Sequence, residues 1–161
     1  MKHTISVTVE NKFGVLSRVV GLFSGRGFNI ESLSVGETLD SSISRITIVT
    51  RGDDRIIEQV TKQLRKLVDV IKVTDLTDSS FVDREMILVK ISATEKTKAE
   101  ILRINEIFRG KIVDISPTSY TFEITGDQGK IGAFIKLIKP FGVKEIVRTG
   151  KVAIAREMNG V

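Results

Sequence analysis

Two spacings of apolar residues alternate along this chain, and their order is the feature that most limits what it can fold into. In residues 4–10 apolar and polar side chains alternate, as in a strand with one buried face. After Gly14 the apolar residues recur at helical spacing, until Gly25 and Gly27 end the helix. Strand patterns at 30–35 and 43–50, a helical pattern from Asp53-Asp54, and a strand pattern at 70–76 follow. The expected order is therefore β-α-β-β-α-β.

This order in so short a stretch is the split βαβ arrangement of a ferredoxin-like fold. Right-handed crossovers place both helices on one face of a four-stranded antiparallel sheet. The strand that begins at Asn29-Ile30 is expected at an edge of that sheet, and the uneven step from Ile30 to Leu33 predicts a β-bulge. A domain this small gains stability by pairing, so we expect a homodimer.

A polar stretch at residues 78–84 predicts a linker, and after it the same order of patterns repeats. The expected strands are 86–93, 111–115, 120–125, 143–148 and 151–155, and the expected helices are 97–108 and 128–139. The last of these strands is additional to the repeated order. We therefore expect an α+β protein with two tandem ferredoxin-like domains, at residues 1–77 and 85–161.

Composition argues against several classes of function. The sequence has no cysteine, which excludes disulfides, thiolate metal ligands and a cysteine nucleophile. The single histidine, His3, argues against a Ser-His-Asp triad and against a zinc site. We expect no catalytic residue and no metal site in this chain. Neither a signal peptide nor an apolar run long enough to cross a membrane is visible, so we expect a cytoplasmic protein.

The net charge of +5 comes mainly from the second half of the chain. Residues 81–161 carry 14 Lys and Arg against 10 Asp and Glu, while residues 1–80 carry 11 against 10. Such an excess suits an acidic partner or nucleic acid, but the interspersed signs favour a solvated surface. An RNA-binding sheet needs aromatic residues on more than one strand, and here only Tyr120 and Phe122 share a strand face. We therefore expect no nucleic-acid partner.

Two short stretches are candidates for ligand binding. The loop Asn11–Gly14 lies between a strand and a helix, where the first helix amides lack partners and attract an anion or a carboxylate. Asn29 and Ile30 follow a glycine turn at the head of the edge strand, and pairing of two chains by that edge brings them toward the partner's loop. Asn and Gly are also common turn and cap residues, so the spacing alone leaves a structural role open.

One further glycine-rich stretch, Gly126–Gly132, invites comparison with a phosphate-binding loop. It fails the P-loop pattern, because its Gly-Lys pair has the wrong spacing and no Ser or Thr follows. The stretch therefore predicts the start of a helix.

Longer blocks of sequence carry a resemblance to a known family. The blocks are NKFGVLSRV at 11–19, GLFSGRGFNIESL at 21–33, SRIT at 44–47, QLRKLVDV at 63–70, REMILVK at 84–90 and EIFRGKIVD at 106–114. The first unit resembles an ACT domain, a small-ligand sensor found in many amino-acid pathway enzymes. Together the blocks resemble the small regulatory subunit of acetolactate synthase, also called acetohydroxyacid synthase, over essentially the whole chain.

The resemblance implies a role in the biosynthesis of branched-chain amino acids. Such subunits are not catalytic. They bind the catalytic large subunit, raise its activity and confer feedback inhibition by a branched-chain amino acid, usually valine, bound where two ACT domains meet. The thiamine diphosphate, Mg and FAD of the assembly are then expected on the catalytic subunit, and no cofactor is expected in this chain. The second domain lacks an Asn/Gly loop, so no ligand is assigned to it, and it is expected to dimerise or to contact the large subunit.

The ligand residues of the family correspond to positions in the two candidate stretches. They are Asn11, Gly14 and Asn29, with the backbone of Val15, Leu16 and Ile30 nearby. One departure is Phe13, which stands where many ACT loops have Pro or Ser, so the preferred amino acid stays open.

The expected mechanism joins two ACT sheets edge to edge. The carboxylate of the amino acid binds helix-start amides near Gly14 and Val15, its ammonium meets carbonyl oxygens and the Asn11 side chain, and the partner's Asn29 and Ile30 close the site. A ligand that bridges two chains binds their alternative arrangements unequally, which is what regulation requires. Two other functions stay open on the sequence, a free-standing amino-acid sensor of the same fold and an RNA-binding ferredoxin-like protein.

Overall fold

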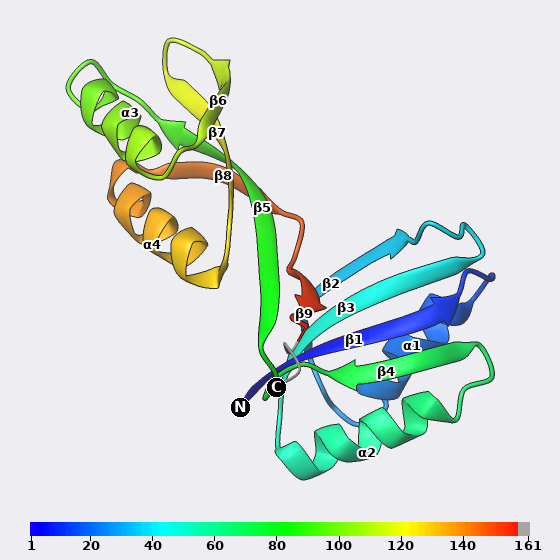
Figure 1. The fold of residues 1–161 in the computed structure, drawn as a ribbon. Coiled ribbons are helices and arrows are strands. Elements are labelled where there is room, and N and C mark those ends of the chain that lie inside the picture. Colours follow the sequence, from blue (N-terminus) through cyan, green and yellow to red (C-terminus); the bar gives the residue numbers. More distant parts are fainter. Residues whose placement is uncertain (158–161) are drawn as a thin grey trace. The chain divides into compact units, whose positions relative to one another are not determined.

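The computed structural model describes residues 1–157 of the chain (Figure 1). It divides them into two compact units. The first holds residues 1–82 together with the described residues from Lys151 on, and the second holds residues 83–150. None of the helices that residues 1–157 form is long and apolar enough to cross a membrane.

The first unit has the β-α-β-β-α-β order that the sequence predicts. Its elements are β1 (Lys2–Glu10), α1 (Val15–Ser24), β2 (Ile30–Glu37), β3 (Ile43–Arg51), α2 (Asp54–Arg65) and β4 (Val70–Asp75). The four strands pair in the antiparallel order β2-β3-β1-β4, so β2 lies at an edge as expected. The expected bulge is confirmed, because the register of β2 on β3 shifts between Ile30 and Ser32.

Both helices of the first unit cover one face of its sheet (Figure 1). The apolar residues of alternating strand positions and of the two helical stripes form a single buried cluster. Its members include Ile5, Val7 and Val9 of β1, Val15, Val19 and Phe23 of α1, and Ile57, Val60 and Leu64 of α2. Burial of each such side chain contributes about 1.5–3 kcal/mol, which makes the cluster the main stabilising element of the unit.

Short polar signals set where the helices of the first unit begin and end. The side chain of Asp53 accepts a hydrogen bond from the Arg55 amide at 2.8 Å and so caps α2. After α1, Gly27 has a φ of 73°, the left-handed conformation expected for it. This conformation costs glycine little because it has no Cβ, so the chain turns sharply from α1 into β2.

The second unit repeats the order of the first. Its elements are β5 (Phe81–Ser92), α3 (Lys98–Ile107), β6 (Lys111–Ile115), β7 (Ser119–Gly126), α4 (Gln128–Ile138), the 3-10 turn η1 (Lys139–Phe141) and β8 (Val143–Arg148). The strands follow the order β6-β7-β5-β8, and the apolar faces of β5, β7, α3 and α4 form a second buried cluster. The chain therefore has the α+β class and the two ferredoxin-like units that the sequence predicts.

The unit boundaries of the structure differ from those expected from the sequence. Strand β5 begins at Phe81, inside the stretch 78–84 expected to be a linker. Strand β9 (Val152–Ala155) forms as expected and pairs with β5 in the five-stranded sheet, while its residues group with the first compact unit. Residues 158–161 of the expected second domain lie outside the described residues.

Three hydrogen bonds explain the grouping of the C-terminal strand with the first unit. The amide of Lys151 donates to Ser32 Oγ at 3.1 Å, and the Arg45 guanidinium donates to the Ala153 carbonyl at 3.2 Å. The amide of Arg156 donates to the Ser80 carbonyl at 2.9 Å. A local apolar pattern predicts that a strand forms, but its pairing with β5 and these distant polar partners decide where it lies.

Candidate functional site

Asn11 lies directly after β1 and joins the first loop of the ACT-like unit to the β2–β3 hairpin. Its amide donates to the Ser42 carbonyl at 2.7 Å. Its side-chain Nδ2 donates to Glu37 Oε1 at 3.2 Å and to the Ser41 carbonyl at 3.0 Å. The residue is exposed to solvent, so these bonds hold a polar side chain at a surface that a ligand can reach.

Helix α1 begins without a side-chain cap. Its N-cap residue is Gly14, with a φ of 81°, and its first turn contains no acidic residue. By contrast, Asp53 caps α2, and Asp127 accepts a hydrogen bond from the Lys130 amide at 2.9 Å at the start of α4. The first amides of a helix have no intrahelical acceptor, so the start of α1 suits a bound carboxylate.

Of the two α1 residues expected beside the ligand, Val15 is buried in the core and Leu16 is exposed. Only their backbone was expected to take part, and the burial of Val15 fits that role because its side chain anchors the first turn of the helix. Phe13, the departure from the family pattern, is fully exposed. Within one chain its ring therefore forms no wall of a site.

The cations beside this loop have partners within the same unit. Lys12 Nζ donates a hydrogen bond to Glu10 Oε2 at 2.8 Å, and this bond raises the pKa of Lys12 above its usual value. The guanidinium of Arg18 pairs with Asp69 at 2.5 Å. The amide of Val15 donates to the Lys12 carbonyl at a long 3.4 Å, and Arg18 Nη1 lies beside Gly14, so the donors nearest to a bound anion are the first-turn amides of α1 and the remaining N–H groups of Arg18.

Asn29 and Ile30 lie at the start of the edge strand, as the sequence predicts. The carbonyl of Asn29 accepts a hydrogen bond from Thr50 Oγ1 at 2.8 Å, and Ile30 is the register partner of Thr50. The Asn29 residue is exposed and Ile30 is partly buried. The bulge that follows Ile30 turns the strand just beyond this pair.

The structure does not bring these two stretches together within one chain. Ile30 pairs with Thr50, and Thr50 pairs with His3 near the start of β1. Asn11 follows the other end of β1. At about 3.3 Å per residue, the ends of β1 are more than about 20 Å apart. A site that includes both stretches must therefore be completed by a second chain.

Sequence reasoning did not single out Glu37 and Ser41, the acceptors that hold the Asn11 side chain. Neither residue belongs to a recognisable motif. The expected strand order could have pointed to them. Because β3 pairs antiparallel with β1, the turn between β2 and β3 lies beside the residue that follows β1.

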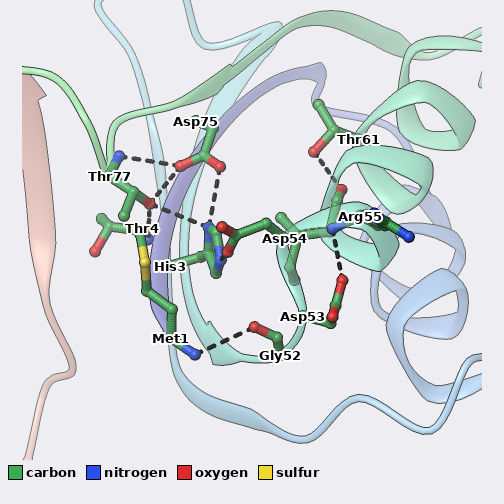
Figure 2. Close-up of polar contacts among 11 residues, drawn as sticks. Met1, His3, Thr4, Gly52, Asp53, Asp54, Arg55, Thr61, Asp75 and Thr77 are labelled. Carbon is green, nitrogen blue, oxygen red and sulfur yellow. Dashed lines mark hydrogen bonds and ion pairs between the residues drawn. The ribbon is translucent and has the colours of Figure 1, made fainter.

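His3 lies near the start of β1, at the end opposite Asn11, and its side chain has a structural role there (Figure 2). The residue is 4% exposed, with ring Nδ1 3.1 Å from Asp75 Oδ2 and Nε2 3.0 Å from Asp54 Oδ1. Ionised carboxylates only accept hydrogen bonds, so both contacts are satisfied when both ring nitrogens carry protons. The side chain thus joins the start of α2 to the end of β4, and within residues 1–157 no three histidine or carboxylate side chains form a metal-binding group.

Two features of the second unit have structural roles. The stretch Gly126–Gly132 begins α4, with Asp127 as its cap, as the failed P-loop pattern predicted. Tyr120 and Phe122 are buried in the core of that unit, so their rings form no exposed platform for stacked bases.

Comparison with known proteins identifies the family. Residues 5–72 match the model of the AHAS small subunit-like ACT domain, and residues 84–157 match the model of the small subunit of acetolactate synthase. The acetolactate synthase small subunit of Aquifex aeolicus is 57% identical over 159 residues, which cover 98% of this chain and 83% of that protein. A probable acetolactate synthase small subunit of Archaeoglobus fulgidus is 54% identical over 97% of this chain and 98% of that protein.

A solved structure agrees with these matches along nearly the full length. The crystal structure of the acetolactate synthase small subunit from Thermotoga maritima superposes with a TM-score of 0.87 at 46% identity, covering 98% of this chain and 99% of that chain. The chain therefore belongs to the family of acetolactate synthase small subunits and carries the ACT domain of that family in its first unit.

Proposed function

We propose that this chain is a regulatory subunit that binds the catalytic large subunit of acetolactate synthase, raises its activity and confers inhibition by valine. The relatives at 57% and 54% identity are named as small subunits of that synthase, and a small subunit requires a large one. Thiamine diphosphate, Mg and FAD then belong to the catalytic subunit, and this chain supplies the effector site.

The observation that carries the proposal is the position of both candidate stretches along the edge strand β2. Ile30 begins β2 and Glu37 ends it, and Glu37 is bonded to Asn11. If β2 of two chains pairs antiparallel over its full length, Ile30 of one chain lies opposite Glu37 of the other. The two stretches that lie apart within one chain then meet twice at the dimer interface.

The chemistry at such a junction suits an amino acid. The uncapped start of α1 offers amides to the carboxylate, and the Asn11 side chain and nearby carbonyl oxygens suit the ammonium. The side chain of the amino acid then packs toward the partner's Ile30. Because the ligand contacts two chains, its binding energy depends on how they are arranged, and coupling of about 1–3 kcal/mol gives a several-fold change in activity.

Co-purification with a catalytic acetolactate synthase subunit tests the whole proposal. We expect a stable complex whose activity exceeds that of the catalytic subunit alone and falls when valine is added. Valine binding without any association with the catalytic subunit would instead identify a free-standing amino-acid sensor. Association without a valine effect would contradict the proposed effector site.

A pair of variants at Gly14 tests where the carboxylate binds. Gly14→Asp and Gly14→Asn add nearly the same volume at a φ of 81°, both bring a Cβ to 3.2 Å from Arg18 Nη1, and they differ by one negative charge. We expect Gly14→Asp to abolish valine binding and to weaken it at least ~10-fold more than Gly14→Asn, because only Asp repels the ligand's carboxylate. Calorimetric titration of the full chain measures both, and unchanged affinity in Gly14→Asp would contradict this assignment.

A further inference from the structure

We infer that Glu37 is a residue of the effector site, where it orients the Asn11 amide and makes the site select ligands that carry an ammonium group. This inference rests on the proposed function, because it adds a residue to the proposed valine site. Its starting point is the contact of Glu37 Oε1 with Asn11 Nδ2 at 3.2 Å.

The two acceptors around Asn11 decide which way its amide points. Nδ2 donates one hydrogen to Glu37 Oε1 and the other to the Ser41 carbonyl at 3.0 Å. A carboxylate and a carbonyl only accept hydrogen bonds, so the flipped amide would place Oδ1 against two acceptors. The orientation of the Asn11 amide is therefore fixed by these two bonds. Its Oδ1 atom points away from both acceptors and is the atom that accepts a hydrogen bond from a ligand.

The other carboxylates around the loop are bonded to groups of their own unit. Asp69 pairs with Arg18, Glu10 pairs with Lys12, and Asp40 accepts two hydrogen bonds from Ser42. Among residues 1–157 no lysine or arginine forms an ion pair with Glu37, whose bonded partner is the neutral Asn11 amide. Glu37 is thus the nearby carboxylate whose charge is left to act on a ligand.

The site has opposite polarity at its two sides. On the Gly14 side, the uncapped start of α1 presents N–H donors, and on the Glu37 side a carboxylate, a carbonyl and the amide oxygen are acceptors. A zwitterionic amino acid matches both sides. A carboxylic acid of the same shape without the ammonium leaves the Glu37 side unpaired, and a site built to bond a ligand's NH group rejects the analogue that lacks it.

Calorimetric titration of the full chain with valine and with 3-methylbutanoate, which is valine without its amino group, tests this inference. We expect the unmodified chain to bind valine roughly 10- to 100-fold more tightly than 3-methylbutanoate. Glu37→Gln keeps an oxygen to accept from Asn11 but removes the charge. We expect it to weaken valine roughly 10-fold while leaving 3-methylbutanoate unchanged or tighter, so that the discrimination shrinks.

Two further variants separate this role from a general effect on folding. Glu37→Ala also releases the Asn11 amide, so we expect it to lose more valine affinity than Glu37→Gln. Glu58→Gln removes a charge from the exposed face of α2, where Glu58 pairs with Lys62, and should leave both ligands unaffected. Thermal unfolding followed by circular dichroism checks that each variant is folded.

The outcomes distinguish this inference from the proposal on which it rests. If the unmodified chain binds no valine, the proposed effector site is wrong, and the inference falls with it. If the unmodified chain binds valine and Glu37→Gln keeps the same ratio between the two ligands, only the role of Glu37 is overturned.

Discussion

Gly110 shows how a single residue is required by contacts that its local sequence does not reveal. The sequence predicts only that Gly110 stops a helix. In the structure Arg109 is the residue with a positive φ, 55°, whereas Gly110 packs closely between Asn105 and Ile124. A Cβ built on Gly110 would lie 2.0 Å from Asn105 Oδ1 and 2.2 Å from Ile124 Cδ1. The absence of a side chain there, and not its backbone freedom, is what the fold requires.

Substitution of Gly110 by alanine is expected to destabilise the second unit by about 1–3 kcal/mol, because both neighbours must move to admit the methyl group. Gly132 provides a matched control on α4 of the same unit, since a Cβ there meets nothing within 4 Å. Gly132→Ala is expected to stabilise the unit by up to about 1 kcal/mol through helix propensity. Chemical denaturation measures both changes, and equal stability of the two variants would contradict the close packing at Gly110.

At the scale of elements, the edge strand β2 carries the proposed function. The sequence placed it at an edge, with a bulge near its start, and both predictions are confirmed. An edge strand presents backbone groups without a partner in the same sheet, so it is a natural place for another chain to add a strand. The sheet has a second edge, β4, and the sequence alone does not say which of the two pairs.

Two variants, each with a lysine introduced on one edge strand, distinguish pairing through β2 from pairing through β4. Val35 on β2 is 47% exposed and Ile71 on β4 is 54% exposed, so the two are matched apolar residues on opposite edges. If two chains pair through β2, Val35→Lys is expected to weaken dimerisation about 10-fold or more, because a charge is desolvated at the new interface. Ile71→Lys is expected to leave it unchanged. Sedimentation equilibrium measures both, and the reverse result would assign the dimer to β4.

At the scale of the whole molecule, the chain returns to its first unit after completing the second. Lys151, Ala153 and Arg156 are bonded to Ser32, Arg45 and Ser80 of the first unit. A stable first unit therefore cannot be obtained by truncating the chain at one position, because the unit includes segments from both ends of the sequence. A fragment that stops at residue 77 would lack both this segment and the start of β5.

A chain that ends at Gly150 is expected to lose about 2–4 kcal/mol of first-unit stability, because three hydrogen bonds to Ser32, Arg45 and Ser80, worth about 1 kcal/mol each, disappear together with the pairing of β9 on β5. The single tyrosine, Tyr120, is buried in the second unit and reports its unfolding by fluorescence. Chemical denaturation should shift the circular dichroism transition of the first unit to lower denaturant and shift the Tyr120 transition less, because the second unit loses only the pairing of β9 on β5. Coincident, unshifted transitions would show that the segment does not support the first unit.

The sequence by itself determined the order of elements, the α+β class, the bulge in β2 and the family to which the chain belongs. These features depend on local spacing, such as the alternation along β1 or the cap at Asp53, and local spacing is visible in a single chain. The blocks of family residues are likewise a property of the sequence alone.

The tertiary structure decided which distant residues meet. Glu37 beside Asn11, the carboxylates beside His3 and the position of β9 all join residues that lie far apart in the chain. No local pattern encodes such pairs, because each depends on strand order and register as well as on the residues themselves. The sequence named both halves of the candidate site and, through the family resemblance, assigned them to two chains, and the fold adds the reason, because one chain holds them at opposite ends of its sheet.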